Sequence, residues 1–470
     1  MKTQRVECVR SMGLVSCAAW LLYACGETVI AVEVGPGSEA SEDEQVTTSE
    51  LAQGGGTLAP EERHRSETAG APVEPEDRHR RAVGKPEESP VGAPSARRCA
   101  GALELVEIAA DGGEWRLGAA APALSGDGRL AFAATDAAGI AHLLLARGGA
   151  LTAVSLEEAR VELPVRVALD ERDNLAFVAA AEGSAELLGV FSTDVGGSGV
   201  RVHYTAEPGG GRGDQGSLIS ARPFALAASG TLAFSSIRDG RGALYRGDAG
   251  GDLERVLTGS GELVNPAQLD VNAAGTVALQ MEHAQCGPQR GILLLDEPNP
   301  PLPTIDQAIA GLSVGLSPEV ALNDAGVIAF ALPGTAATVQ LLRCPEGEPP
   351  ERFELTTGVY TALRTPLGER PELTLVAGNG GAFASFGEVD IDGAGRVVFE
   401  AELTAGGRGI FRGPDVARDK IVAEGDELGG ELVTEVQLGE LNDACQLSFA
   451  TVSASGRRVW RAGMQPAASP

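Results

Sequence analysis

Seven short segments of the chain repeat one pattern of apolar and polar positions. The pattern begins with an apolar residue and then Asn or another turn-forming residue. Two variable residues, Gly and two further residues follow, and the pattern ends with a small residue and Phe. The most regular copy runs from Leu322 to Phe330, as LNDAGVIAF. Asn bonds its own downstream backbone and starts a turn, and Gly supplies the positive φ that closes it. The alternation after Gly predicts the start of a strand with one buried face.

The other copies keep this pattern with few departures. In chain order the seven copies begin at Leu124, Leu169, Leu226, Val271, Leu322, Ile391 and Leu441. Asp173 and Cys445 stand in the Gly position, Ala227 in the Asn position and Leu279 in the Phe position. One such hairpin is unstable alone, whereas seven packed face to face bury a shared core. We expect the small residue before Phe to let neighbouring sheets approach closely.

Further strands follow each hairpin, as at Gly409 to Arg412 and Lys420 to Ala423, so each repeat has the four strands of a propeller blade. The last repeat lacks its fourth strand, and a spare strand lies before the first repeat, at Leu103 to Ala109. If the spare strand completes the last blade, the ring closes and leaves no bare sheet edge. The sequence therefore predicts an all-β fold, a seven-bladed β-propeller over residues 99–465, with a disordered tail at 466–470.

The repeats resemble the bacterial tandem-repeat family that is named for its NxxGxxAF motif, whose members carry varied surface anchors. The similarity covers about residues 100–465, and Asp173, Ala227, Leu279 and Cys445 are its departures. The resemblance implies a secreted or surface location and a propeller-like fold, with no established activity.

The N-terminus has the form of a bacterial secretion signal. Three basic residues precede an uncharged apolar stretch, 11–24, which is too short to span a bilayer comfortably. Its end, Leu22-Tyr-Ala-Cys25-Gly26, resembles a lipobox, so residues 1–24 are predicted to be a lipoprotein-type signal peptide and Cys25 the lipidated residue. An ordinary cleaved signal or a retained anchor remains the alternative. Because Gly26 follows the cysteine, resemblance to Gram-negative lipoproteins implies the outer membrane; the wider prediction is a cell-envelope or extracellular protein.

Residues 25–98 differ in composition from the rest of the chain. Glu, Pro, Gly, Ser, Thr and Ala dominate, and apolar periodicity is absent. Such a segment buries too little apolar surface to offset its ordering entropy. It is predicted to be a disordered tether between the membrane and the propeller.

Charge and motifs exclude several classes of function. The formal net charge of −28 argues against nucleic-acid binding, which needs a basic surface. The chain has no HExxH or P-loop motif, and its histidines at 142, 203 and 283 lie in three different repeats. No catalytic residue is therefore assigned.

Two of the cysteines are placed to meet in the folded region. Cys445 lies in the first turn of the last blade, and Cys99 lies just before the spare strand of the same blade. A Cys99–Cys445 disulfide would lock the ring closure in an oxidising compartment. Cys286 and Cys344 fall at opposite faces and are not expected to pair. The absence of CxxC spacing argues against zinc.

Calcium is the one metal that the sequence brings into question. Asp390 and Asp392 precede a Gly turn, and Asp270 and Asn272 have the same spacing. Oxygen ligands two residues apart can chelate Ca²⁺. The ligand run is incomplete and the same residues are explained as turn formers, so no cofactor is the first hypothesis and calcium the weaker one.

Three functions remain open. The first is a lipid-anchored, non-enzymatic propeller that binds an envelope protein or glycan. The second is a polysaccharide hydrolase or lyase, which would need clustered carboxylates with a His or Arg at one mouth of the channel. The third is a structural surface component that associates with itself. Insertions at 195–217 and 333–387 are the first places to look for a binding surface, since propellers bind through loops.

Overall fold

The computed structural model describes most of the chain from Leu103 onward. The described residues are 103–180, 188–196, 199–205, 224–238, 241–258, 263–283, 289–295, 319–332, 338–343, 351–363 and 373–464. The predicted signal peptide, tether and C-terminal tail lie outside them. Within these residues no helix is long and apolar enough to cross a membrane.

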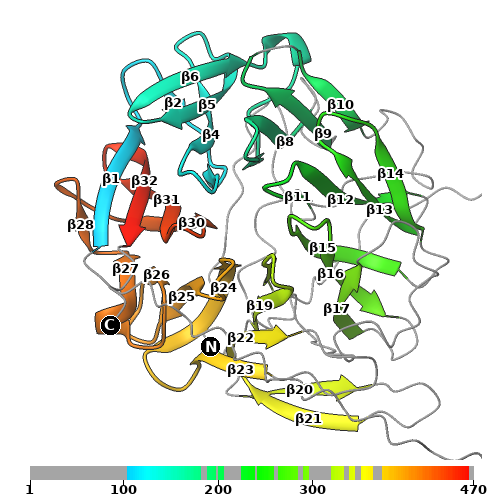
Figure 1. Ribbon diagram of the computed structural model, residues 1–470. Coiled ribbons are helices and arrows are strands. Elements are labelled where there is room, and N and C mark those ends of the chain that lie inside the picture. The colour runs from blue at the N-terminus through cyan, green and yellow to red at the C-terminus, as the bar shows by residue number, and fades with distance from the viewer. Residues whose placement is uncertain are drawn as a thin grey trace, which may run out of the picture. The chain divides into compact units, whose positions relative to one another are not determined.

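The described strands form seven antiparallel blades that follow one another around a ring, besides two two-stranded hairpins, which confirms the all-β, seven-bladed β-propeller (Figure 1). The strands of the first three blades are β2 (Arg116–Leu117), β3 (Ala123–Leu124), β4 (Leu130–Thr135), β5 (Ala141–Arg147) and β6 (Ala150–Ser155) in blade 1; β7 (Arg166–Leu169), β8 (Asn174–Ala180), β9 (Leu188–Asp194) and β10 (Arg201–Thr205) in blade 2; and β11 (Phe224–Leu226), β12 (Thr231–Arg238), β13 (Arg241–Asp248) and β14 (Leu253–Thr258) in blade 3. A short 3-10 helix, η1 (Glu157–Ala159), joins blades 1 and 2.

The next three blades have the same plan with two differences. Their strands are β15 (Leu263–Val271), β16 (Val277–His283) and β17 (Gln289–Leu295) in blade 4; β18 (Glu319–Leu322), β19 (Val327–Ala331), β22 (Gly358–Leu363) and β23 (Leu373–Gly378) in blade 5; and β24 (Phe383–Ile391), β25 (Val397–Leu403), β26 (Arg408–Phe411) and β27 (Lys420–Ala423) in blade 6, with α1 (Val416–Asp419) before β27. Blade 4 has three strands within the described residues. A separate hairpin, β20 (Thr338–Arg343) and β21 (Glu351–Thr356), interrupts blade 5 between β19 and β22.

Blade 7 is built from both ends of the described chain. Its strands run in the order β1 (Leu103–Ala110), β32 (Gly456–Met464), β31 (Gln446–Ser453) and β30 (Glu435–Leu441). β1 pairs with β32 from Leu103 opposite Met464 to Ala110 opposite Arg458. The prediction that the spare N-terminal strand completes the last blade is therefore confirmed. A small hairpin, β28 (Glu427–Leu428) and β29 (Glu431–Leu432), connects blades 6 and 7.

The motif turns have the same backbone conformation in all seven blades. The residue in the Gly position has φ between 59° and 89°, as at Gly128, Asp173, Gly230, Gly275, Gly326, Gly395 and Cys445. Asp173 and Cys445 thus adopt the left-handed conformation that glycine adopts without strain. The two departures from Gly alter the residue and leave the turn intact.

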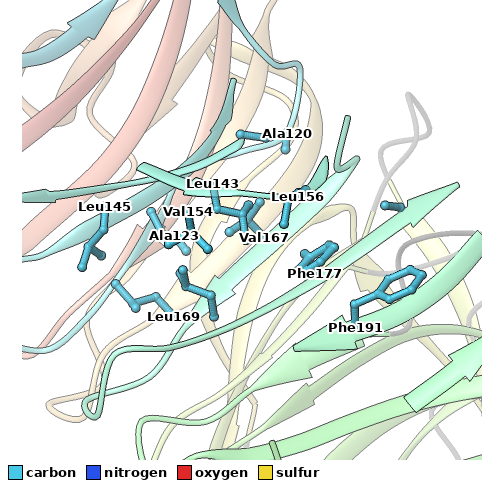
Figure 2. Close-up of a cluster of buried hydrophobic side chains, with 14 of the residues drawn as sticks. Ala120, Ala123, Leu143, Leu145, Val154, Leu156, Val167, Leu169, Phe177 and Phe191 are labelled. Carbon is cyan, nitrogen blue, oxygen red and sulfur yellow. The ribbon is translucent and has the colours of Figure 1, made fainter. Parts of the chain in front are cut away.

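The apolar core is divided among the seams between successive blades. Buried side chains form seven clusters in the described residues, and each cluster joins one blade to the next, including blade 7 to blade 1. Figure 2 shows the seam between blades 1 and 2, where Leu143 and Val154 meet Val167 and Phe177. The small residues before Phe are buried at 0–1% exposure, as at Ala131, Ala176 and Ala329, which confirms the expected close approach of the sheets.

Candidate functional site

In six of the seven blades the side chain of the motif residue organises its own turn; blade 3 has Ala227 at this position. The Oδ1 atom of Asn323 accepts the amide of Val327 at 2.8 Å. Equivalent bonds to the residue four positions on are made by Asp170, Asn272, Asp392 and Asn442. The sequence predicted this bond from the preference of Asn and Asp for such turns.

The same side chains also link neighbouring blades, which the sequence did not indicate. Asn272 Nδ2 donates to the carbonyl oxygen of Asn323 at 3.2 Å, and Asn323 Nδ2 donates to that of Asp392 at 2.9 Å. Asn442 Nδ2 donates to the carbonyl oxygen of Ser125 at 2.9 Å, across the closing seam. The amide group therefore joins blades 4 to 5, 5 to 6 and 7 to 1.

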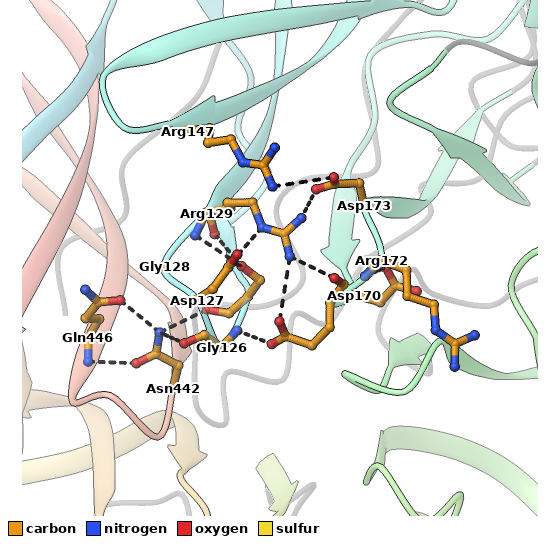
Figure 3. A network of polar contacts seen from close by, with 12 residues as sticks. Gly126, Asp127, Gly128, Arg129, Arg147, Asp170, Arg172, Asp173, Asn442 and Gln446 are labelled. Atoms are coloured by element: carbon orange, nitrogen blue, oxygen red, sulfur yellow. Dashed lines mark hydrogen bonds and ion pairs between the residues drawn. The ribbon is translucent and has the colours of Figure 1, made fainter.

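In blade 1 an arginine makes the equivalent link, because the hydroxyl of the motif residue Ser125 donates to Asp127 within its own turn. Arg129 is only 5% exposed and lies at the centre of the polar network between blades 1 and 2 (Figure 3). Its guanidinium donates to Asp127 Oδ1 at 2.6 Å and to the carbonyl oxygen of Glu171 at 3.0 Å. It also forms an ion pair with Asp173, the residue that replaces Gly in the turn of blade 2. The strained residue is thus held by a charge from the neighbouring blade.

Three carboxyl groups occupy equivalent positions on the inner strands, two residues before the motif residue. Asp270 accepts the amides of Val271 at 2.8 Å and, from blade 5, Leu322 at 2.7 Å. Asp390 accepts the amides of Ile391 at 2.8 Å and, from blade 7, Leu441 at 2.5 Å.

Glu440 completes this set at the closing seam, because its Oε2 accepts the amide of Leu124 in blade 1 at 2.7 Å. We call Asp270, Asp390 and Glu440 the channel carboxyls.

The channel carboxyls bind protons more tightly than ordinary side chains. Burial raises the pKa of Asp270 to about 6 and that of Glu440 to about 7. Burial also raises the pKa of Asp390 well above its usual value, and the charges of Asp270 and Glu440 add to this effect. Hydrogen bonds from the backbone amides and, for Asp270 and Glu440, the charge of Arg166 on β7 act in the opposite direction.

The four calcium candidates are divided between two environments. Asp270 and Asp390 are channel carboxyls, and both oxygens of each accept backbone amides. Asn272 and Asp392 organise their turns, and Asp392 forms an ion pair with Arg396. No group of three or more metal-ligating side chains is found among the described residues. Calcium binding stays a prediction.

Cys445 forms a disulfide bond, and its partner lies outside the described residues. Cys99, Cys286 and Cys344 also lie outside them, as does Cys25, so the pairing with Cys99 stays a prediction. The register of blade 7 is compatible with it. Glu104 and Gln446 both stand opposite Gly463, which places the start of β1 two strands away from the turn that holds Cys445.

Two histidines make local contacts that hold them in the fold. His142 Nε2 lies 3.1 Å from Asp136 Oδ2. His203 Nε2 lies 2.7 Å from Ser192 Oγ, a geometry that resembles a serine–histidine catalytic pair. Ser192, however, is buried and donates its proton to the carbonyl oxygen of Ala249 at 2.6 Å, so its hydroxyl accepts from His203. This serine links blades 2 and 3 and is not activated as a nucleophile.

The roles of Arg129, Arg166 and Glu440 were not predicted from the sequence. A signal for Glu440 was available, because acidic residues stand two positions before the motif residue in three of the seven repeats. In a strand, residues two apart share a face, so this position repeats around the channel.

The structure of blade 5 corrects the predicted insertion at 333–387. β22 and β23 are regular strands of the blade, so the part that leaves the blade is the hairpin at 338–356. In the other predicted insertion, β10 is the outer strand of blade 2.

Comparison with known proteins finds similarity in fold alone. No protein-family model and no curated protein matches the chain. Among solved structures, one of two prolyl endopeptidases is 13% identical over 72% of this chain, with a TM-score of 0.43, and the match spans 45% of the peptidase chain. The β-propeller domain of the trilobed protease from Pyrococcus furiosus is 11% identical over 76% of this chain and 100% of its own, with a TM-score of 0.40. An oligogalacturonate lyase in complex with manganese is 14% identical over 72% of this chain and 86% of its own, with a TM-score of 0.39.

Proposed function

We propose that this protein is a cell-envelope lipoprotein that presents its propeller as a non-enzymatic binding module for an envelope protein or glycan. The leader that ends at Cys25 supports the anchor. The seven turns of one conformation support membership of the NxxGxxAF repeat family. The lipid anchor and the family membership both rest on the resemblance of the sequence to a lipobox and to the NxxGxxAF repeats.

The observation that carries the binding role is the β20–β21 hairpin. It forms a two-stranded sheet of its own and has no part in the four-stranded sheet of blade 5. At its base, Leu355 is partly buried and packs on the apolar seam between blades 4 and 5, so the hairpin is held in place. A hairpin that the ring does not need for closure is suited to contact a partner.

Strand direction places this hairpin away from the side where the chain enters the propeller. The inner strand of each blade runs towards the motif turn, and successive strands of a blade are antiparallel. β1 therefore starts at the face that carries the motif turns, whereas the hairpin leaves blade 5 at the opposite face.

The anchor is tested by metabolic labelling with a fatty acid and by cell fractionation, with Cys25→Ser as the control. The proposal expects label and membrane association in the native chain and neither in the variant. Label in both proteins would exclude Cys25 as the lipidated residue.

The binding role is tested by affinity capture from envelope extracts. The bait is the full chain with Cys25→Ser, and the matched variant has residues 338–356 replaced by a short Gly-Ser linker. A protein or glycan that the first bait retains and the variant loses, at equal melting temperature, supports the proposal. Equal capture by both baits removes the hairpin from the binding surface, and ordered self-association of the bait favours the structural alternative.

A specific observation favours a second candidate, a polysaccharide hydrolase or lyase. The charges of Asp270 and Glu440 act on Asp390, and the charge of Arg166 acts on Asp270 and Glu440, so carboxyls and an arginine interact as such an enzyme needs. Glu440, with a pKa raised to about 7, has the affinity for protons of a general acid. Incubation with neutral and uronate-containing polysaccharides tests this. Release of reducing ends or unsaturated products by the native chain, lost in Glu440→Gln and kept in Glu435→Gln, would establish the enzyme.

A further inference from the structure

Six blades have a fourth, outer strand within the described residues, and one edge of that strand is open at the rim of the ring (Figure 1). These strands are β6, β10, β14, β23, β27 and β1, in blades 1, 2, 3, 5, 6 and 7. Backbone amides and carbonyls along an open edge can pair with a strand of another chain. Natural proteins prevent such pairing with charged residues on the strand and with β-bulges that bend its edge.

Five of these six outer strands carry at least one of the two protections. The pairing of β1, β10, β14, β23 and β27 with the neighbouring strand is interrupted by a register shift. All of them except β23 also contain charged residues. β6 has neither protection, because its sequence is ALTAVS and it pairs with β5 without a shift.

The residues of β6 are also exposed to solvent. Only Val154 is buried, in the seam with blade 2, and the other five residues of the strand are exposed. The side chain of Leu151 is among them, with the residue 41% exposed. A regular, uncharged strand edge therefore stands open on the outside of blade 1.

The hairpin between β5 and β6 determines which backbone groups point to this edge. Gly148 and Gly149 form a two-residue turn, with φ of 54° and 88°. A hydrogen-bonded pair flanks such a turn, so every second residue from Ala150 onward bonds to β5. The amide of Leu156 fits this alternation, because it donates to the carbonyl oxygen of Ala141 at 2.9 Å. The residues whose amides and carbonyls point to the open edge are Leu151, Ala153 and Ser155.

Opposite charges flank β6 along the chain. Arg147 precedes the strand, and its side chain is 66% exposed and lies 3.9 Å from Asp173. Glu157 and Glu158 follow the strand and are exposed. In an antiparallel pair of two β6 strands, the start of one strand lies beside the end of the other. Opposite charges then meet at both ends, whereas a parallel pair would bring like charges together.

We propose that the edge of β6 is an interface with a second copy of this chain, in which the two β6 strands pair antiparallel about a two-fold axis. An axis at Ala153 sets this residue opposite its counterpart and Leu151 opposite Ser155, so that all the outward-pointing backbone groups pair. The interface is complete with two copies and differs from the open-ended association of a structural component. It requires neither the lipid anchor nor a partner of the β20–β21 hairpin.

The contact is short, so the dimer is weak, with a Kd on the order of 10–100 µM. Sedimentation velocity of the full chain with Cys25→Ser, at increasing concentration, measures it. Ala153→Lys is the informative variant: the position is exposed in the single copy, and the two-fold axis sets the two new charges against each other. Thr374→Lys, at an exposed position of β23, adds the same charge to another outer strand and is the matched control.

We expect the native chain and the control to dimerise equally, and Ala153→Lys to weaken the dimer by about tenfold or more. Equal melting temperatures of the three proteins would show that the variants are folded. Equal dimerisation of all three proteins would overturn the proposal, as would a native chain that stays monomeric up to about 0.5 mM.

Charge reversal tests the antiparallel arrangement with independent variants. Arg147→Glu, and separately the double variant Glu157→Arg with Glu158→Arg, bring like charges together at both ends of the pair. Each should dimerise about three- to tenfold less than the native chain. A mixture of the two variants restores opposite charges at both ends and should form a heterodimer with near-native affinity. A mixture that associates no better than either variant alone would overturn the antiparallel pairing of β6.

Discussion

Asn323 Nδ2 donates a 2.9 Å hydrogen bond to the carbonyl oxygen of Asp392, and so joins the motif turn of blade 5 to that of blade 6. Oδ1 of the same side chain accepts the amide of Val327 within its own turn. One buried amide group therefore closes a turn and links two blades. This double use explains why Asn is the typical residue at this position, although Asp or Ser can form the turn alone.

Replacement of Asn323 separates the two uses. Asn323→Ala removes both bonds at a position that is 4% exposed and leaves polar backbone groups buried, so it should lower the free energy of unfolding by about 1–3 kcal/mol. Asn323→Asp keeps the acceptor for Val327 and loses the donor to Asp392. Urea unfolding should give a higher free energy of unfolding for the native chain than for either variant. If the Asn323→Asp variant were as stable as the native chain, the bond between the two blades would contribute nothing to stability.

The positive φ of Asp173 gives a second prediction. Asp173→Gly and Asp173→Ala both lose the ion pair with Arg129, so both should be less stable than the native chain. An alanine at this position would still adopt the unfavourable left-handed backbone conformation, which glycine adopts without strain. The Asp173→Ala variant should therefore be less stable than the Asp173→Gly variant by about 1 kcal/mol. Chemical denaturation measures the difference. Equal stability of the two variants would contradict the strained turn.

The disulfide of Cys445 gives a third prediction. Peptide mapping without reduction should recover a peptide that contains Cys99 linked to one that contains Cys445. Cys99→Ser should then lower stability by about 2–4 kcal/mol, because the bond closes a loop of almost the whole propeller. Cys286→Ser is the control and should have little effect. A Cys445 peptide linked to another cysteine would refute the pairing.

His203 gives a fourth prediction, with its own pH window. Burial lowers the pKa of His203 below 6.5, so folding favours the neutral ring. Its contribution to stability is full above pH 6.5 and is lost as pH falls through the folded-state pKa. His203→Gln does not titrate, so the native chain should lose stability relative to this variant between pH 6.5 and pH 5. A difference in unfolding free energy that is constant with pH would show that His203 has an ordinary pKa.

The repeat made most of the fold predictable from the sequence. The turn of Asn323 and Gly326 and the alternation up to Phe330 are local, so they appear in the sequence as they do in the structure. The spare strand at Leu103 was predictable because a closed ring leaves no unpaired strand. β22 was not assigned because no motif marks it and the inserted hairpin separates it from β19.

The contacts between blades could not be predicted in the same way. Asn323 meets Asp392, and Glu440 meets Leu124, through the packing of whole sheets, which no local pattern encodes. Arg166 and Glu440 lie on different blades, and the charge of Arg166 lowers the pKa of Glu440. The channel carboxyls thus became visible as one group only when the ring was closed.

The central claim is a ring that is closed by β1, and removal of that strand tests it most directly. Deletion of residues 103–110 is compared with deletion of 72–79, an equally long stretch of the predicted tether, by thermal unfolding of the full chain with Cys25→Ser. If β1 completes blade 7, its loss exposes the edge of β32, so the melting temperature should fall by 10 °C or more, on the order of a few kcal/mol. A synthetic peptide of residues 103–112 should restore part of that loss. Equal melting of the two deletion variants would contradict the closed ring.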